Sequence, residues 1–254
     1  MSTYGLWLSA AGMQVNDHKQ TVLANNLANS GTVGFKHDLA VVRQRLVESR
    51  ENPGAPGVAH PVMDGLSGGL ETLPTHVSFT QGSIEPTGRS LDIAIDGEGF
   101  FTVSDGQQER YTRDGVFTLN ADGELVLSAG GGRWKLQGGG ASIQTEPGQG
   151  KISVSSSGVI RQGDNVIGEI ELVTNPDKQQ LKKAGENLFE NRGNEMVPAD
   201  GILIAEAKEH STFDAMQGLA SMIQVTRAYQ LNATMVQLQD QMTGQAVSRV
   251  GKVA

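Results

Sequence analysis

The sequence predicts an α+β protein in which a long helix at each end flanks a central all-β domain. Residues 3–29 and 212–250 repeat their apolar positions with helical spacing, whereas residues from about 81 to 201 form short alternating runs divided by turns. The 33 glycines and only 8 prolines fit many tight turns. We expect the helices to pair as a coiled-coil-like stem, with boundaries at 1–36 for the N-terminal helix, 37–80 for an extended connector, 81–205 for the β domain and 206–254 for the C-terminal helix.

Composition excludes several classes of function. The formal charge of −8 and the lack of any Lys/Arg cluster argue against nucleic-acid binding, and no run approaches the roughly 18 apolar residues of a membrane span. The absence of cysteine excludes disulfides, thiolate metal sites and cysteine nucleophiles. The N-terminal residues lack the features of a cleaved secretory signal, so these signals alone would place the chain in the cytoplasm.

The N-terminal helix has a narrow apolar stripe, which is typical of a helix that meets another helix. Tyr4, Leu8, Ala11, Val15 and Val22 fall within roughly 60° on a wheel of 100° per residue. Asn26 and Asn29 continue this stripe. An amide in such a seam lowers stability and selects one alignment, so we expect these asparagines to set the register between subunits.

The connector shows no sustained period. Its NPGAPGVAHP and DGLSGGLE stretches are rich in turn residues, and short strands are expected only near residues 71–77. A disordered linker is the alternative interpretation.

The central domain is predicted to be a β meander or sandwich. Its expected strands are LDIAI, GFFTV, RYTR, VFTL, ELVLS, KISVSS, GVIRQ, NVIGEIELV and GILIAEA, and the glycine-rich AGGGRWKLQGGG is interpreted as a divider.

The C-terminal helix is apolar on two opposite faces. One face carries Leu219, Met222, Thr226, Tyr229, Ala233 and Val236, and the other carries Ala228, Leu231, Met235, Leu238 and Met242. The N-terminal helix can cover one of these faces, so the other calls for further subunits. The alternative is that the β domain folds back over it.

No pattern of residues indicates a catalytic, cofactor or metal site. The histidines His18, His37, His60, His76 and His210 lack metal-binding spacing, and the glycine runs fit neither dinucleotide nor phosphate-loop patterns. Asp92, Asp96, Asp105 and Asp114 are expected in solvated turns with ordinary pKa values. We therefore expect no enzyme activity.

Three blocks resemble the flagellar axial proteins, the family of basal-body rod, hook and hook-associated subunits. In the first, ANNLANSGTVGFK, the match runs through Ala24, Asn25, Asn26, Leu27, Ala28, Asn29, Thr32, Gly34, Phe35 and Lys36. The second matches at Ser90, Asp92, Ala94, Ile95, Gly97, Gly99, Phe100, Phe101, Tyr111, Thr112, Arg113, Gly115, Phe117, Gly123 and Leu125. The third matches at Met222, Ile223, Arg227, Ala228, Tyr229 and Asn232, although HSTFDAMQ replaces the family's usual Ser-Asn-Val-Asn turn ahead of this helix.

The resemblance implies a structural subunit of the flagellar basal-body rod, of distal-rod rather than proximal-rod type. Such subunits pass through the flagellar export apparatus without a cleaved signal and stack helically, with other rod and hook proteins, into a hollow shaft across the periplasm that transmits torque. The motif residues expected to direct assembly and register are Asn25, Asn26, Leu27, Asn29, Thr32, Gly34, Phe35 and Lys36. Those expected to pack between subunits are Leu8, Val15, Val22, Met222, Ile223, Arg227, Tyr229, Leu231, Met235, Leu238 and Met242.

The competing function is a glycan- or protein-binding β module with helical appendages. A patch of exposed aromatic side chains would support it, and its candidates are Phe79, Phe100, Phe101, Tyr111 and Trp134.

Overall fold

The computed structural model describes residues 4–46, 68–145, 150–193 and 195–250 and confirms the α+β class. It consists of two compact units, each built from segments distant in the sequence. Unit 1 comprises Met1–Leu27, Asp38–His76 and Ala215–Ala254, and unit 2 comprises Ala28–His37 and Val77–Asp214. The middle of the predicted connector, including NPGAPGVAHP and His60, lies outside the described residues.

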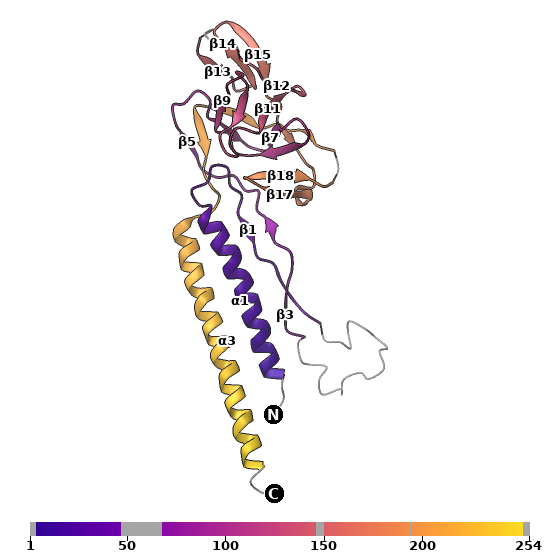
Figure 1. Ribbon diagram of the computed structural model, residues 1–254, viewed down its shortest axis with the longest axis vertical. Coiled ribbons are helices and arrows are strands. Elements are labelled where there is room, and N and C mark those ends of the chain that lie inside the picture. The colour runs from indigo at the N-terminus through magenta and orange to yellow at the C-terminus, as the bar shows by residue number, and fades with distance from the viewer. Residues whose placement is uncertain (1–3, 47–67, 146–149, 194, 251–254) are drawn as a thin grey trace. The chain divides into compact units, whose positions relative to one another are not determined.

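Unit 1 contains the two predicted helices, α1 (Tyr4–Ala28) and α3 (Ala215–Val250), which lie side by side and run in opposite directions (Figure 1). Glycines on α1 let the helices approach closely, because a Cβ on Gly12 would lie only 2.9 Å from the Asn232 amide nitrogen. The 36 residues of α3 would extend over about 54 Å.

A two-stranded ribbon accompanies the helices in unit 1. Strand β2 (Val42–Gln44) pairs antiparallel with β3 (Leu70–Thr72), and Arg43 and Glu71 form an exposed ion pair at 2.9 Å across it. The short strands β1 (Asp38–Leu39) and β4 (His76–Val77) complete this part of the chain. The strands expected near residues 71–77 are therefore present as β3 and β4.

An antiparallel sheet of eight strands dominates unit 2. Its order is β17 (Leu181–Gly185), β18 (Leu188–Asn191), β8 (Glu109–Thr112), β7 (Phe101–Ser104), β11 (Lys135–Gly138), β10 (Leu125–Leu127) and β9 (Phe117–Leu119), with β12 (Ala141–Ser142) paired to β11.

Smaller sheets complete unit 2. Strands β13 (Ile152–Val154), β14 (Val159–Gln162) and β15 (Asn165–Glu169) form one of three strands. The two-stranded pairs are β6 (Ile93–Asp96) with β20 (Ile202–Ala205), β5 (Ile84–Pro86) with β21 (Ala207–Glu209), and β16 (Val173–Thr174) with β19 (Val197–Pro198). A 3₁₀ turn, η2, covers Lys178–Gln180.

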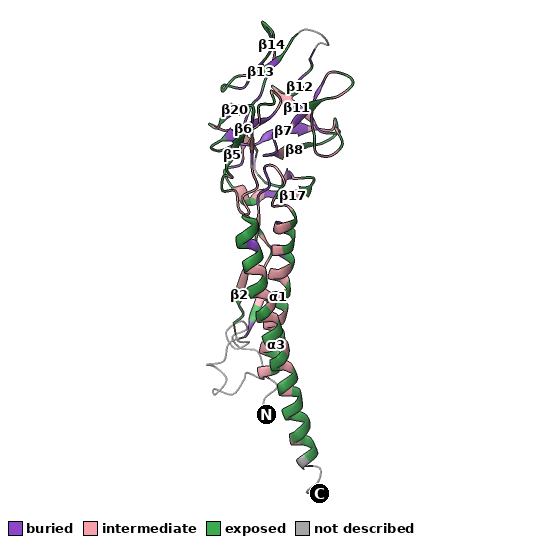
Figure 2. Cartoon of the chain, turned by 90° about the vertical axis from the view of Figure 1, so that its left-hand side faces the viewer, coloured by how far each residue is buried: buried purple, intermediate pink, exposed green. Residues whose placement is uncertain are grey.

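The buried side chains concentrate in unit 2, as the purple segments of Figure 2 indicate. The main cluster includes Ile95, Val103, Leu127 and Leu136, all fully buried, and Phe101 meets Phe117 edge to face at 5.3 Å. A second cluster joins Phe100, Leu181 and Phe189, with Phe79 packed against it. Aromatic edge contacts of this kind stabilise a core beyond area burial alone.

Every predicted run contains an observed strand, but eight strands were not predicted: β1, β2, β5, β11, β12, β17, β18 and β19. Strand β11 lies within the segment interpreted as a divider, between glycines that adopt positive φ, such as Gly132 and Gly139. The hairpin of β17 and β18 turns at Glu186 and Asn187, which adopt φ values of 51° and 59° without glycine's freedom. Because neither residue is a glycine, the sequence gives little indication of a hairpin turn at this position.

The expectation that Asp114 has an ordinary pKa is wrong. Its side chain is buried, and this desolvation raises the pKa from 3.8 to about 6, although the Val116 backbone N–H donates to the carboxylate and opposes the shift. The nearby Asp92 carboxylate adds to the increase.

Stability should therefore fall as pH rises from about 4 to 6, because the folded state retains a proton that the unfolded chain releases near 3.8. We expect Asp114→Asn, which keeps the acceptor for Val116, to raise the free energy of unfolding at pH 7.5 by about 3 kcal/mol. Denaturant titrations of both proteins should show this difference disappear by about pH 4. A difference that is constant with pH would contradict the shifted carboxyl.

Candidate functional site

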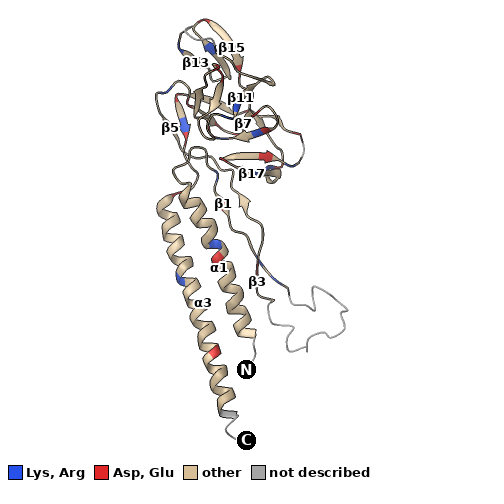
Figure 3. Ribbon diagram, in the orientation of Figure 1, with Lys and Arg blue, Asp and Glu red and all other residues tan. Residues whose placement is uncertain are grey.

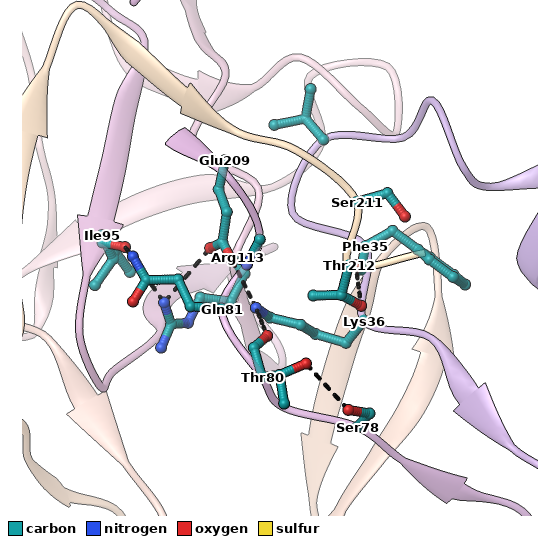
Figure 4. A network of polar contacts seen from close by, with 12 residues as sticks. Phe35, Lys36, Ser78, Thr80, Gln81, Ile95, Arg113, Glu209, Ser211 and Thr212 are labelled. Atoms are coloured by element: carbon teal, nitrogen blue, oxygen red, sulfur yellow. Dashed lines mark hydrogen bonds and ion pairs between the residues drawn. The ribbon is translucent and has the colours of Figure 1, made fainter. Parts of the chain in front are cut away.

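The last residue of the N-terminal motif, Lys36, is buried in unit 2 in an ion pair. Its Nζ lies 2.6 Å from Glu209 Oε1 and donates to the Thr80 carbonyl at 2.7 Å (Figure 4). The Lys36 and Glu209 side chains are 1% and 0% exposed. Burial lowers the pKa of Lys36, and the adjacent Glu209 carboxylate opposes this shift.

A second buried cation, Arg113, shares the same carboxylate. Its Nη1 lies 3.5 Å from Glu209 Oε2, its Nη2 donates to the Gly97 carbonyl at 2.7 Å, and the guanidinium lies 5.3 Å from the centre of the Phe100 ring. Burial lowers the pKa of Arg113, and Glu209 again opposes the shift. The Gly82 backbone N–H also donates to Glu209 Oε1, at 2.7 Å. We call Lys36, Arg113 and Glu209 the ion cluster.

Gly34 and Phe35 bring the chain into this cluster. Gly34 has φ 65°, a Cβ on it would lie 2.5 Å from the Arg113 carbonyl, and its N–H donates to the Glu209 carbonyl at 2.8 Å. Phe35 is buried beneath Lys183, whose Nζ lies 4.1 Å from the centre of the ring. Gly34, Phe35 and Lys36 were predicted to direct assembly. In the structure they anchor their own chain within unit 2, and their role in assembly stays a prediction.

The turn after α1 is closed by two other motif residues. Thr32 donates from its backbone N–H to the Asn29 carbonyl at 3.1 Å and from its hydroxyl to the Asn29 side-chain oxygen at 3.3 Å. Both residues are half-buried. These contacts show that Asn29 and Thr32 help to end α1.

Asn26 is buried and bonded to the segment that follows the motif. Its side chain is 1% exposed, its amide nitrogen donates to the Asp38 carbonyl at 2.8 Å, and its oxygen accepts from the Asp38 N–H at 2.9 Å. Within unit 1, the Asn26 carboxamide thus makes with Asp38 of β1 the two hydrogen bonds that a neighbouring strand could otherwise make. These bonds satisfy the amide within its own chain, and its role in setting the register between subunits stays a prediction.

The predicted packing residues differ in burial. Val15 and Val22 are buried by their own chain, and their role between subunits stays a prediction. Leu8, Met222 and Tyr229 are half-buried, and Ile223 and Arg227 are exposed. Of the residues predicted to direct assembly, Leu27 is half-buried and Asn25 is exposed. Leu219, predicted on the same face of α3 as Met222, is 47% exposed.

The other apolar face of α3 is uncovered in the described chain. Leu231, Met235, Leu238 and Met242 are 68%, 48%, 47% and 51% exposed. Their spacing of four, three and four residues places them along one side of the helix. We call these four residues the apolar row.

Glu209 and Thr80 were missed by the analysis of the sequence, and Arg113 was noted only as part of a motif. Nothing in the residues around Glu209 distinguishes it from a surface carboxylate. The signal that could have found the cluster is a basic motif residue next to an apolar run, because a buried cation needs a buried anion.

The aromatic side chains offered for glycan binding belong to the core. Phe100, Phe101 and Trp134 are buried, and Phe79 and Tyr111 pack against the second cluster. The binding-module alternative is therefore not favoured. Among the described residues no group of His, Cys, Asp and Glu could hold a metal ion, and neither helix there has the apolar length to cross a bilayer.

We expect Lys36→Met to lower the free energy of unfolding by about 3 to 5 kcal/mol, because it leaves Glu209 buried with a single distant cation. Glu209→Gln should cost a similar amount, and the double variant should cost less than the sum of the two. Trp134, the only tryptophan of unit 2, reports the transition in a Trp7→Phe background.

The exposed pair of Arg43 and Glu71 supplies the control, because Arg43→Met should cost no more than about 1 kcal/mol. Strictly additive effects of the two buried substitutions would show that Lys36 and Glu209 do not interact.

Asn26→Leu should speed exchange of the Asp38 amide hydrogen, because the substitution removes the side-chain oxygen that accepts from this N–H, at a cost of about 1 to 3 kcal/mol. Hydrogen exchange of that amide is the measurement, and Asn25→Leu, at an exposed position of the same turn, is the control. Unchanged protection in the Asn26 variant would contradict the assignment.

Three segments of the chain match described protein families. Residues 9–36 match the family described as "Flagella basal body rod protein", residues 94–162 match "Flagellar hook protein FlgE/F/G D1 domain", and residues 207–249 match "Flagellar basal body rod FlgEFG protein C-terminal". The ion cluster takes one residue from each segment, Lys36 from the first, Arg113 from the second and Glu209 from the third.

Similar proteins extend over nearly the whole chain. The flagellar basal-body rod protein FlgF of Caulobacter vibrioides is 34% identical over 236 residues, covering 91% of each chain. The FlgG rod protein of Bacillus subtilis is 30% identical and covers 96% of this chain and 97% of its own. FlgG of Buchnera aphidicola (subsp. Baizongia pistaciae) is 30% identical over 93% of this chain and 96% of its own. With this extent of similarity, the chain belongs to the flagellar basal-body rod protein family.

Proposed function

We propose that this chain is a structural, non-enzymatic subunit that polymerises helically with copies of itself into the hollow rod of the flagellar basal body, where it transmits torque. The family membership supports the rod role. The observation that carries the polymerisation is the apolar row on α3, because a structural subunit needs surfaces that gain free energy only when another subunit covers them.

The helices would serve as the stem of each subunit. We propose that α1 and α3 pair in a coiled-coil-like manner through their facing residues. Val15, Val22 and Asn26 are buried at spacings of seven and four, which is the repeat of such a seam. Met222, Val225, Tyr229, Asn232 and Val236 are half-buried at spacings of three and four along α3, which supports the same pairing.

The partners and location follow from the family. We propose contacts with other rod and hook proteins at the ends of the polymer, passage through the flagellar export apparatus, and a position in the periplasmic part of the basal body. The preference for a distal-rod position stays a prediction, since proteins named FlgF and FlgG are both among the relatives.

We expect Leu238→Asp and Met235→Asp each to prevent incorporation into the rod while unit 2 stays folded. Covering one such side chain contributes about 2 kcal/mol, or about 30-fold in an association constant, and a buried unpaired carboxylate adds a further cost. Basal bodies isolated from cells that express each variant can be analysed by electron microscopy, with Trp134 fluorescence of the purified chain reporting on the fold of unit 2.

Gln237→Asp is the matched control, because it introduces the same charge at an exposed position of α3 outside the apolar row. Rods of normal length and number from the Leu238 and Met235 variants would refute an intersubunit role for this face.

A further inference from the structure

A groove of about 300 Å³ lies in unit 1 between α1 and the ribbon of β2 and β3. From α1 it is lined by Trp7, Ala10, Ala11 and Gln14, and from the ribbon side by Arg45, Leu70, Glu71 and Thr72. None of the functions considered above uses this groove.

The groove has the form of a hole for an apolar side chain. Trp7 and Leu70, on its two sides, are 42% and 47% exposed. Ala10 and Ala11 are small residues, so they leave room where a longer side chain of α1 would fill the space. Packing between helices requires such holes, each of which receives one projecting side chain.

The Trp7 side chain, which forms one side of the groove, packs closely against the backbone at Gly69. Gly69 has φ 88°, and a Cβ there would lie 2.6 Å from Trp7 Cζ3, so only a glycine lets the ribbon approach the indole this closely. Tyr4 stacks on the same ring, with 6.5 Å between ring centres. An exposed indole that is fixed on both sides is prepared for contact at little entropic cost.

We propose that this groove binds the apolar row of α3 from a second copy of the chain. This inference rests on the proposed rod function and specifies which surface receives the uncovered face. Leu231, Met235, Leu238 and Met242 follow the spacing by which a helix inserts side chains into a groove.

The distribution of charge favours an identical copy as the occupant. The chain has a net charge of −8, yet α1 carries only Asp17 and Lys19, and α3 only Arg227, Asp240 and Arg249, as the mostly tan helices of Figure 3 show. On the ribbon side of the groove, Arg45 and Glu71 add one charge of each sign, so the two surfaces can pack without the net repulsion that two acidic copies otherwise experience.

Polar residues beside the row fit the rim of the groove. Gln241 and Gln245 flank the apolar row on α3 and are exposed. A glutamine amide both donates and accepts, so it can bond with the guanidinium of Arg45 and with the carboxylate of Glu71, which line the groove.

The proposed contact could repeat from one copy of the chain to the next. The groove lies between α1 and the ribbon, whereas the row lies on α3, so the two surfaces of the contact are different. Heterologous contacts of this kind leave one free surface of each type at the ends and generate open helical polymers.

Disulfide cross-linking tests the proposal, because the chain has no cysteine of its own. Cells express two single-cysteine variants together, Ala11→Cys with Leu238→Cys, and in a second strain Ala11→Cys with Met235→Cys. After oxidation of isolated basal bodies, at least one pair should give a dimer of this chain, since a disulfide requires Cα atoms within about 7 Å. Each chain has one cysteine, so a mixed dimer identified by mass can only be intermolecular.

Ala11→Cys with Gln237→Cys is the control and should give at least about ten-fold less mixed dimer, because Gln237 points away from the row. Maleimide should label Ala11→Cys in the monomer and fail to label it in rods. Should Ala11→Cys not assemble, Ala10→Cys takes its place.

Rods without a mixed dimer above the control, or protection of Ala11→Cys already in the monomer, would refute the groove as the receiving surface. Normal rods from Leu238→Asp would instead refute the intersubunit role of α3, so the two failures are distinguishable.

Discussion

A single buried carboxylate determines how the central unit is closed. Glu209 is the last residue of β21, and the ammonium of Lys36, the guanidinium of Arg113 and the N–H of Gly82 surround its carboxylate. Each of these charges would be costly alone in the protein interior, but together they compensate one another. Residues separated by 173 and 96 positions are thereby held in one place. The short segment that follows α1 is thereby held in the β domain, whose other residues begin more than 40 positions after Lys36 in the sequence.

The sequence was sufficient for the parts of the fold that depend on periodicity. The two helices end within three residues of their expected limits, and the alternating runs are strands, because a repeated apolar spacing leaves few ways to bury the same side chains. Strands β11, β17 and β18 depend on glycines and on Glu186 and Asn187 at positive φ, which are tertiary preferences rather than repeated patterns. The four-part division of the chain stays a prediction.

The sequence indicated some residues of the site, but not the contacts that they make. Asn26 stood out because an amide continues an apolar stripe, and Lys36 because it ends the first motif, and both are buried. Their partners are the Asp38 backbone and Glu209, which lie 12 and 173 positions away in the sequence. No local sequence pattern predicts these contacts. Val15 and Val22, predicted to pack between subunits, are buried by their own chain, whereas Leu238 and Met242 remain uncovered in the described chain.

The uneven distribution of charge also affects when assembly can begin. Nearly all of the excess acid lies outside the two helices, so unassembled copies repel one another through the rest of their surface. This repulsion extends over about 10 Å at 0.1 M salt and weakens as ionic strength rises. Encounters in dilute solution are therefore discouraged. In the proposed polymer, a copy delivered to an existing end would gain apolar contacts that offset the repulsion. Such a balance would suppress nucleation more than elongation and favour growth of one rod over the start of many.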